Sequence, residues 1–174
     1  MEKCVAEGIP RDMFDGQAKI GEILGRLRSA NASGFAIGLH LQFAAPRYLF
    51  QAYAPDWTEF YSRNGYLLRD PVVRWSVANV GAIRWSDLER PTDDPVMPAA
   101  AAHGLRYGFA LSIMLDGSHS VGAFARPDRE ANEEEIEAAK RDLAELHRLT
   151  AGLTQLTPGL HAALKRLSID LTRR

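Results

Sequence analysis

Two pairs of alternating apolar segments constrain the fold of this chain more than any other feature of its sequence. In the clearer pair, residues 107–115 read YGFALSIML and residues 119–126 read HSVGAFAR, with Asp116-Gly117 between them. Alternation with a period of two is typical of β-strands, and Asp-Gly between two such runs favours a tight hairpin turn. The sequence therefore predicts an antiparallel strand pair here.

The other pair precedes it. Residues 34–43 read GFAIGLHLQF, and after Ala45-Pro46 the run RYLFQAYA occupies residues 47–54. We expect an antiparallel hairpin, with Tyr53 near the end of its second strand. The alternation predicts two faces for the first strand, one with Phe35, Ile37, Leu39 and Leu41 and the other with Ala36, Gly38, His40 and Gln42.

Helical signals flank these strands. Apolar residues recur at spacings of three and four, and capping residues stand before several of the runs. The predicted helices are 17–30, 55–64, 71–80, 95–103, 132–155 and a last one that starts at Thr157-Pro158. Asp70-Pro71 and Asp94-Pro95 are cap signals, and Asn132 with Glu135 resembles a capping box. Residues 81–88 are expected to be a short strand or extended segment that contains Trp85.

Short strands interleaved with helices predict the α/β class. We expect an α/β/α sandwich with a mostly antiparallel central sheet of about five strands and helices on both faces, similar to PAS and GAF domains. A sheet between two helix layers leaves room for an internal pocket.

Charge and composition exclude several kinds of partner. The 174 residues carry 21 basic and 22 acidic side chains, so a net charge of −1 gives this chain alone no field that attracts nucleic acid. The single cysteine, Cys4, forms no intrachain disulfide, and no apolar run approaches the roughly 20 residues of a membrane span. The start of the chain is too polar for a secretory signal. We expect a cytoplasmic protein without a membrane partner.

Catalytic and metal-binding patterns are missing from the sequence. It contains no glycine-rich phosphate loop and no G-x-S-x-G elbow, and the five histidines lack ligand spacing. We therefore expect neither an enzyme nor a cofactor or metal site.

Aromatic residues with polar tips are dense between residues 53 and 107: Tyr53, Trp57, Tyr61, Tyr66, Trp75, Trp85 and Tyr107. Such side chains suit a mainly apolar pocket with a few fixed polar contacts, but they also pack ordinary cores. The same two interpretations apply to Asp70, which is either a helix cap alone or a cap that also contacts a ligand.

An ordered set of motifs resembles the autoinducer-binding domain of LuxR-type quorum-sensing regulators. The set is Tyr53-x-x-x-Trp57-x-x-x-Tyr61, Asp70-Pro71-Val72-Val73, Trp85-Ser86-Asp87 and Gly104-Leu105-Arg106-Tyr107-Gly108. The similarity covers roughly residues 17–155. It implies an α/β/α sandwich that binds an N-acyl-homoserine lactone.

The resemblance also implies a role for individual residues. Trp57 would donate its indole N–H to the lactone carbonyl, Asp70 would accept from the ligand amide, and Tyr53 would donate to the acyl carbonyl. Tyr61 and Trp85 would form aromatic walls, and Val72 and Val73 would line the acyl side.

Four further pocket positions complete the prediction. Ala110 stands where several relatives carry a threonine, and Ala123 or Ala125 falls where others place a supporting hydroxyl. Gly38 beside Ala36 could deepen the pocket, although Ile37 and Leu39 could close it.

Domain organisation follows from the same resemblance. Residues 1–16 would be an extension, 17–155 the sensor domain and 156–174 a linker helix, with the DNA-binding helix-turn-helix domain absent from this chain. We expect ligand-coupled folding and a homodimer, with the apolar stripe of residues 132–155 either in the dimer interface or covering the sheet. The alternatives are a natural regulator without a DNA-binding domain that inhibits a full-length relative by heterodimerisation, a sensor of another small molecule, and a protein-binding module.

Overall fold

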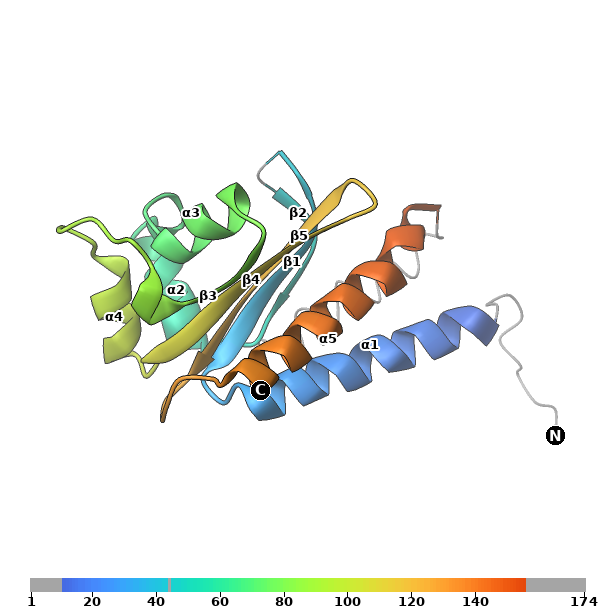
Figure 1. Ribbon diagram of the computed structural model, residues 1–174, viewed down its shortest axis with the longest axis horizontal. Coiled ribbons are helices and arrows are strands. Elements are labelled where there is room, and N and C mark those ends of the chain that lie inside the picture. The colour runs from blue at the N-terminus through green and yellow to red at the C-terminus, as the bar shows by residue number, and fades with distance from the viewer. Residues whose placement is uncertain (1–10, 44, 156–174) are drawn as a thin grey trace, which may run out of the picture.

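A five-stranded antiparallel sheet separates two layers of helices (Figure 1). The structure is a computed structural model that describes residues 11–43 and 45–155. The strand order is β2-β1-β5-β4-β3, and every pair of neighbours is antiparallel. The strands are β1 (Gly34–Gln42), β2 (Ala45–Gln51), β3 (Gly81–Arg84), β4 (Tyr107–Leu115) and β5 (Ser118–Arg126). This architecture confirms the predicted α/β/α sandwich.

Five α-helices and three short 3-10 turns complete the described chain. The helices are α1 (Arg11–Ala30), α2 (Pro55–Arg63), α3 (Pro71–Ala78), α4 (Val96–Ala102) and α5 (Glu133–Ala151). The 3-10 turns are η1 (Tyr66–Leu68), η2 (Trp85–Asp87) and η3 (Gly152–Gln155). Helices α1 and α5 lie side by side on one face of the sheet, and α2, α3 and α4 cover the other face (Figure 1).

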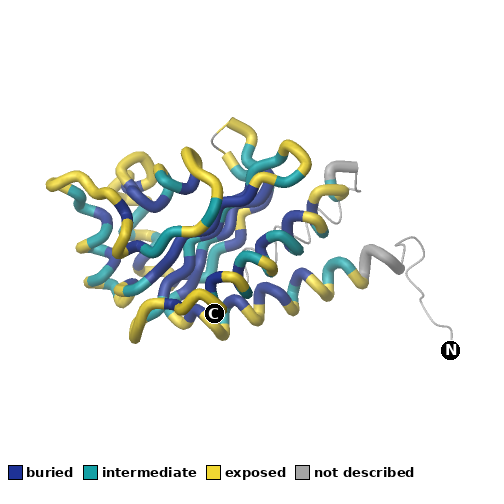
Figure 2. Tube along the Cα trace, viewed as in Figure 1, coloured by how far each residue is buried: buried dark blue, intermediate teal, exposed yellow. Residues whose placement is uncertain are grey.

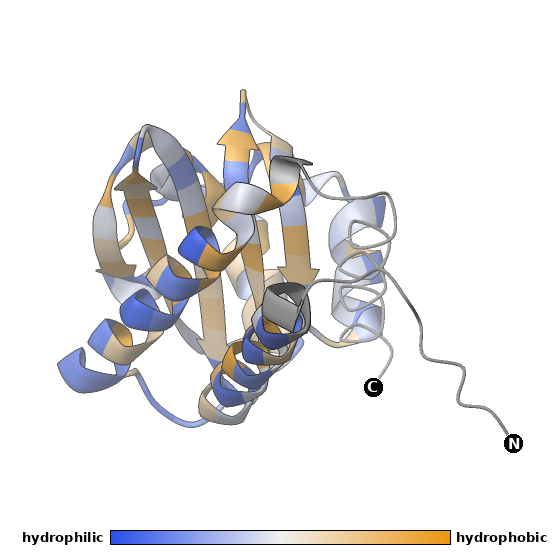
Figure 3. Cartoon of the chain, turned by 90° about the vertical axis from the view of Figure 1, so that its right-hand side faces the viewer, coloured by the Kyte–Doolittle hydropathy of each residue, from blue (hydrophilic) through white to orange (hydrophobic). Residues whose placement is uncertain are grey.

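The α1/α5 face holds the larger hydrophobic core. Phe109 and Phe124 stack on neighbouring strands with ring centroids 4.9 Å apart. The apolar stripe of α5 is buried against this core, with Leu143 and Leu146 fully enclosed. Figure 2 shows the buried residues following the sheet and the inner helix faces, and Figure 3 shows hydrophilic and hydrophobic residues alternating along the helices in front of the sheet. Most of the α5 stripe therefore covers the sheet.

Local capping chemistry sets the ends of several helices as predicted. The Asp70 side chain accepts from the backbone N–H of Val72 at 2.8 Å, which satisfies one free amide in the first turn of α3. Asn132 and Glu135 form a complete capping box at the start of α5. Gly65 adopts a left-handed φ of 63° directly after α2, a conformation that glycine reaches without steric cost.

The alternation predicted for β1 is wrong beyond Leu39. His40 has a φ of 54°, and its ring hydrogen-bonds to Thr150 of α5, so it lies on the α1/α5 face. Leu41 instead contacts the cavity described below, next to Gly38. A left-handed residue breaks the two-residue period, because successive side chains then no longer point to opposite faces.

Some element boundaries also differ from the prediction. Helix α1 begins at Arg11 rather than at residue 17, and β2 ends at Gln51, so Tyr53 lies in the connection to α2. Trp85 belongs to η2 instead of an extended segment, and α4 begins only at Val96. The predicted helix after Pro158 lies outside the described residues.

Among the helices that the structure describes, none has both the length and the apolar content needed to cross a membrane.

Candidate functional site

A cavity of about 370 Å³ lies between the sheet and the layer of α2, α3 and α4. This volume is within the range of small-molecule sites, and apolar side chains form most of its wall. The cavity brings together most of the residues singled out in the sequence, namely Gly38, Tyr53, Trp57, Tyr61, Asp70, Val72, Val73, Trp85 and Ala123.

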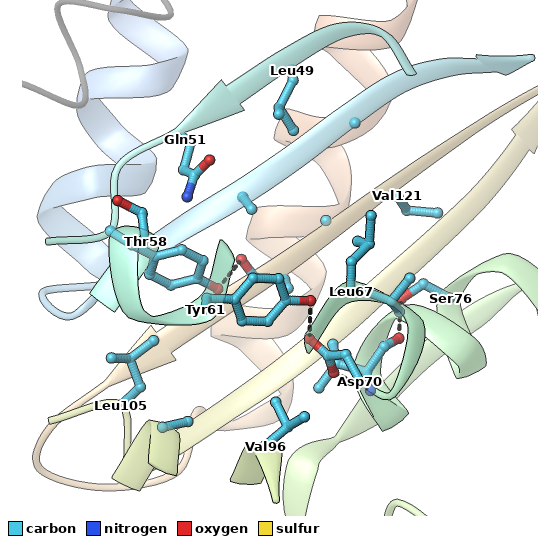
Figure 4. Close-up of a pocket in the computed structure, with 18 of the residues that line it drawn as sticks. Leu49, Gln51, Thr58, Tyr61, Leu67, Asp70, Ser76, Val96, Leu105 and Val121 are labelled. Atoms are coloured by element: carbon cyan, nitrogen blue, oxygen red, sulfur yellow. Dashed lines mark hydrogen bonds between the residues drawn. The ribbon is translucent and has the colours of Figure 1, made fainter. Parts of the chain in front are cut away.

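Asp70 is the charged group on this wall. One carboxylate oxygen accepts from the Tyr61 hydroxyl at 2.8 Å, and the other accepts from the Val72 amide at 2.8 Å (Figure 4). Burial raises the pKa of Asp70 above its usual value, although both of these hydrogen bonds oppose the shift. An ionised carboxylate has about four acceptor positions, so Asp70 retains capacity for a ligand donor.

Two tyrosines extend this polar region. The Tyr53 hydroxyl donates to the backbone carbonyl of Ala123 at 3.1 Å, which ties the β2–α2 connection to β5. Burial and the nearby Asp70 charge raise the pKa of Tyr53 and of Tyr61 above the usual tyrosine value. Both hydroxyls therefore stay protonated at neutral pH and remain donors.

Trp57 offers a free donor to the cavity. Its ring packs edge-on against Tyr61 at 5.5 Å and lies 5.2 Å from the His103 ring, which holds the indole in place on α2. The indole N–H makes no hydrogen bond to any residue within the described part of the chain. Because Trp57 lines the cavity, a ligand acceptor placed beside this N–H would gain a hydrogen bond.

Trp85 forms the cavity wall beside β4, and the position of its ring depends on the absence of a side chain at Gly108. A Cβ atom added at Gly108 would lie 2.5 Å from two carbons of the Trp85 indole and 2.6 Å from the backbone oxygen of Phe124. The indole therefore packs flat on the bare backbone of β4. Its own N–H is enclosed and has no partner among the described residues.

Three predicted residues do not line the cavity. Ala110 and Ala125 are fully buried in the apolar cluster that includes Trp57 and Trp85, and neither reaches the cavity. Tyr107 was expected among the ligand-binding residues, but strand alternation places it with Phe109, whose ring belongs to the α1/α5 core.

Several cavity residues were not predicted from the sequence. They come mainly from β2, η1, α3 and α4: Leu41, Pro46, Leu49, Gln51, Thr58, Ser62, Leu67, Ser76, Val77, Val96, Met97, Ala100, Leu105 and Val121. Helical spacing from Val72 and Val73 could have indicated Ser76 and Val77, which are one turn further along α3. No local signal marks the contribution of α4, because its position over the sheet is a tertiary property.

In the part of the chain that the structure describes, the cavity wall does not have the side chains of a metal-binding site. The described residues contain no group of three or more His, Cys, Asp or Glu side chains placed to hold an ion. The arrangement instead combines a free donor, a carboxylate acceptor and a large apolar surface. It suits a small molecule that has a polar head with both an acceptor and a donor, joined to an apolar part.

Comparison with known proteins identifies related sequences. Residues 21–151 match the family model of the autoinducer binding domain. The chain is 33% identical over 79 residues to the transcriptional activator protein VanR of Vibrio anguillarum, a match that covers 44% of this chain and 33% of VanR. It is 32% identical over 74 residues to the regulatory protein SdiA of Escherichia coli, covering 42% and 31% of the two chains. The matched segment thus spans about a third of each relative.

Solved structures share the fold at low sequence identity. The N-acylhomoserine lactone dependent LuxR family transcription factor CepR2 of Burkholderia cenocepacia aligns with a TM-score of 0.57 and 16% identity, over 83% of this chain and 93% of CepR2. SdiA in complex with octanoyl-rac-glycerol aligns with a TM-score of 0.61 and 23% identity, over 82% of this chain and 63% of SdiA. At these identities, the likeness extends to the fold alone.

Proposed function

This chain belongs to the autoinducer-binding domain family of LuxR-type regulators, and on that premise we propose that it binds an N-acyl-homoserine lactone in the cavity of about 370 Å³. The family is one of ligand-binding regulatory domains that take a small-molecule ligand rather than a cofactor, and it is not a family of enzymes. In the proposal, residues 17–155 are the sensor domain, residues 1–16 an extension and residues 156–174 a linker.

The observation that carries the proposal is the pairing of a free donor with a carboxylate acceptor on one cavity wall. The Trp57 indole can only donate, and the ionised Asp70 carboxylate can only accept. A lactone carbonyl matches the first and an amide N–H matches the second, so one ligand orientation satisfies both. The Tyr53 hydroxyl donates to the Ala123 carbonyl and the Tyr61 hydroxyl donates to Asp70, and the Tyr61 bond fixes the direction of the carboxylate.

Ligand binding should stabilise the folded chain. A ligand that fills the cavity binds the folded state and not the unfolded one, so it adds about 2.7 kcal/mol at a free concentration of 100 Kd. For a chain of this size that corresponds to a rise in Tm of roughly 5–10 °C. The test is thermal unfolding of the purified 174-residue chain with and without lactones of increasing acyl length.

Two substitutions locate the head group. Asp70→Asn keeps an acceptor for the Val72 amide but removes the charge, so we expect the ligand affinity to fall about 5- to 150-fold, which corresponds to a loss of about 1–3 kcal/mol. Stability without ligand should stay unchanged or rise, because burial already disfavours the charged form of Asp70. Trp57→Phe should likewise weaken binding by removing the free donor.

A matched control for Trp57→Phe comes from a tryptophan that does not line the cavity. Trp75 lies on α3 and is not among the cavity residues. Trp75→Phe should leave the affinity within about twofold of the original chain. Equal losses of stability and affinity in Asp70→Asn would assign that residue a structural role instead.

A second candidate ligand is a monoacylglycerol. SdiA, which shares the fold, is seen in complex with octanoyl-rac-glycerol. A glycerol hydroxyl can donate to Asp70 as an amide does, and the ester carbonyl can accept from Trp57. Including 1-octanoylglycerol in the thermal panel separates the two classes, because stabilisation by the glycerol ester without stabilisation by any lactone overturns the lactone proposal.

For assembly, we propose a cytoplasmic homodimer whose formation follows ligand binding. The alternative is a heterodimer with a full-length relative that this chain inactivates. Size-exclusion chromatography with light scattering, with and without the stabilising lactone, tests the first arrangement. Mixing the chain with a full-length relative, followed by DNA binding of the mixture, tests the second.

A further inference from the structure

The cavity has a closed end and an open end. At the closed end, Trp85, Val96, Ala100 and Leu105 are almost fully buried. At the open end, three apolar side chains that line the same cavity are exposed: Leu67 at 59%, Val77 at 48% and Leu49 at 46%. We call these three residues the mouth.

The mouth is built from three separate elements that converge. Leu67 comes from η1, Val77 from α3 and Leu49 from β2, and Figure 4 shows Leu67 of η1 and Leu49 of β2 around the same open space. Single exposed apolar residues are common on protein surfaces and need no explanation. A convergent apolar rim at the opening of a cavity is different, because it offers an apolar contact surface that is continuous with the binding site.

Between the two ends, the sheet provides a floor of small residues. Ala36 and Gly38 of β1 pair with Ala123 and Val121 of β5, and all four positions line the cavity. Ile37 and Leu39 point into the α1/α5 core, so they do not close this passage. Asp70 and Trp57 are buried deeper than the mouth residues, which leaves the mouth for the part of a ligand that is remote from the polar head.

We propose that the acyl chain of the ligand runs over this floor and leaves the cavity through the mouth, so that the domain accepts long acyl chains whose ends cover Leu67, Val77 and Leu49. The inference rests on the proposed function, since it places the polar head at Trp57 and Asp70. Selectivity at the mouth is for length and apolar character. Each additional methylene that is buried there adds about fourfold to the affinity, or about 0.8 kcal/mol.

The experiment measures the dissociation constants of straight-chain lactones from butanoyl to tetradecanoyl by titration calorimetry on the full chain. In the original sequence, the affinity should rise with length and show no fall for the longest chains. Leu67→Ser and Val77→Ser should leave short chains unaffected and weaken long chains about 5- to 10-fold. The length at which this effect begins marks the point where the acyl chain reaches the mouth.

Neighbouring exposed residues provide matched controls. Leu68 is 88% exposed and Val80 is 63% exposed, but neither lines the cavity. Leu68→Ser and Val80→Ser should therefore leave the affinity for every length unchanged. Leu67→Trp should narrow the mouth and reduce binding of long chains while short chains still bind.

The outcomes separate this inference from the proposed function. Binding that peaks at a medium length and then falls would show a closed acyl site and overturn the inference alone. The same conclusion follows if Leu67→Ser weakens all lengths equally or weakens none. Absence of binding at every length would overturn the proposed function, and the inference with it.

Discussion

Replacing Gly108 by alanine tests the idea that a bare strand backbone positions the cavity wall. The new Cβ would lie 2.5 Å from two indole carbons of Trp85 and 2.6 Å from the Phe124 carbonyl oxygen, where 3.4–4 Å is ordinary contact. One of these obstacles is the Trp85 ring, which lines the cavity and has open space on that side. The other belongs to the backbone of β5, which the ladder between β4 and β5 holds in place.

The size of the effect follows from that geometry. An overlap of about 1 Å in an enclosed site is a case of overpacking, which costs roughly 1–3 kcal/mol. For a chain of this length, each kcal/mol lowers Tm by about 2–4 °C. Because the Trp85 ring is displaced into the cavity, the affinity for ligand should also fall. In a Trp85→Phe background the same substitution should cost less, since the smaller ring leaves space for the Cβ.

Urea unfolding monitored by circular dichroism gives the free energy of unfolding, and calorimetry gives the ligand affinity. Gly21→Ala is the matched control, because nothing lies within 4 Å of a Cβ at this position of α1. That variant should be unchanged or more stable by up to about 1 kcal/mol, since alanine loses less backbone entropy in a helix than glycine does. The reasoning about Gly108 is refuted if Gly108→Ala keeps both its stability within about 0.5 kcal/mol and its ligand affinity.

Two further predictions concern the helix layer opposite the cavity. Burial, together with the charges of His147 and Arg47, lowers the pKa of His40 from 6.5 to about 4, so the unfolded chain binds more protons below neutral pH. The contribution of neutral His40 to the free energy of unfolding should be fully present above about pH 7 and should fall by roughly 1–2 kcal/mol by pH 5. A free energy of unfolding that stays constant between pH 7 and 5 in urea titrations contradicts this. Asn132→Ala removes the acceptor for the Glu135 amide, 2.9 Å away, and should cost about 1 kcal/mol of unfolding free energy, whereas Asn132→Asp retains the cap; equal stability of the two variants in urea would show that the capping box contributes nothing.

Much of the fold could be predicted because its signals are local. The Asp116-Gly117 turn joins β4 to β5 as expected, and the cap at Asp70 starts α3 at the expected residue. The spacing of Trp57 and Tyr61 brings both rings to one side of α2, and both line the cavity. Each of these features depends on residues within a few positions of one another, so the printed sequence contains the whole cause.

The sequence by itself therefore determined the two hairpins, the starts of α2, α3 and α5, and the aromatic composition of the site. The tertiary structure decided which of those side chains meet. It turned His40 towards α5 and Leu41 towards the cavity, because one left-handed residue reverses the order of faces. It also left Leu67 and Val77 exposed at the opening of the cavity. These outcomes depend on how distant elements pack across the sheet, and no pattern within one segment encodes that packing.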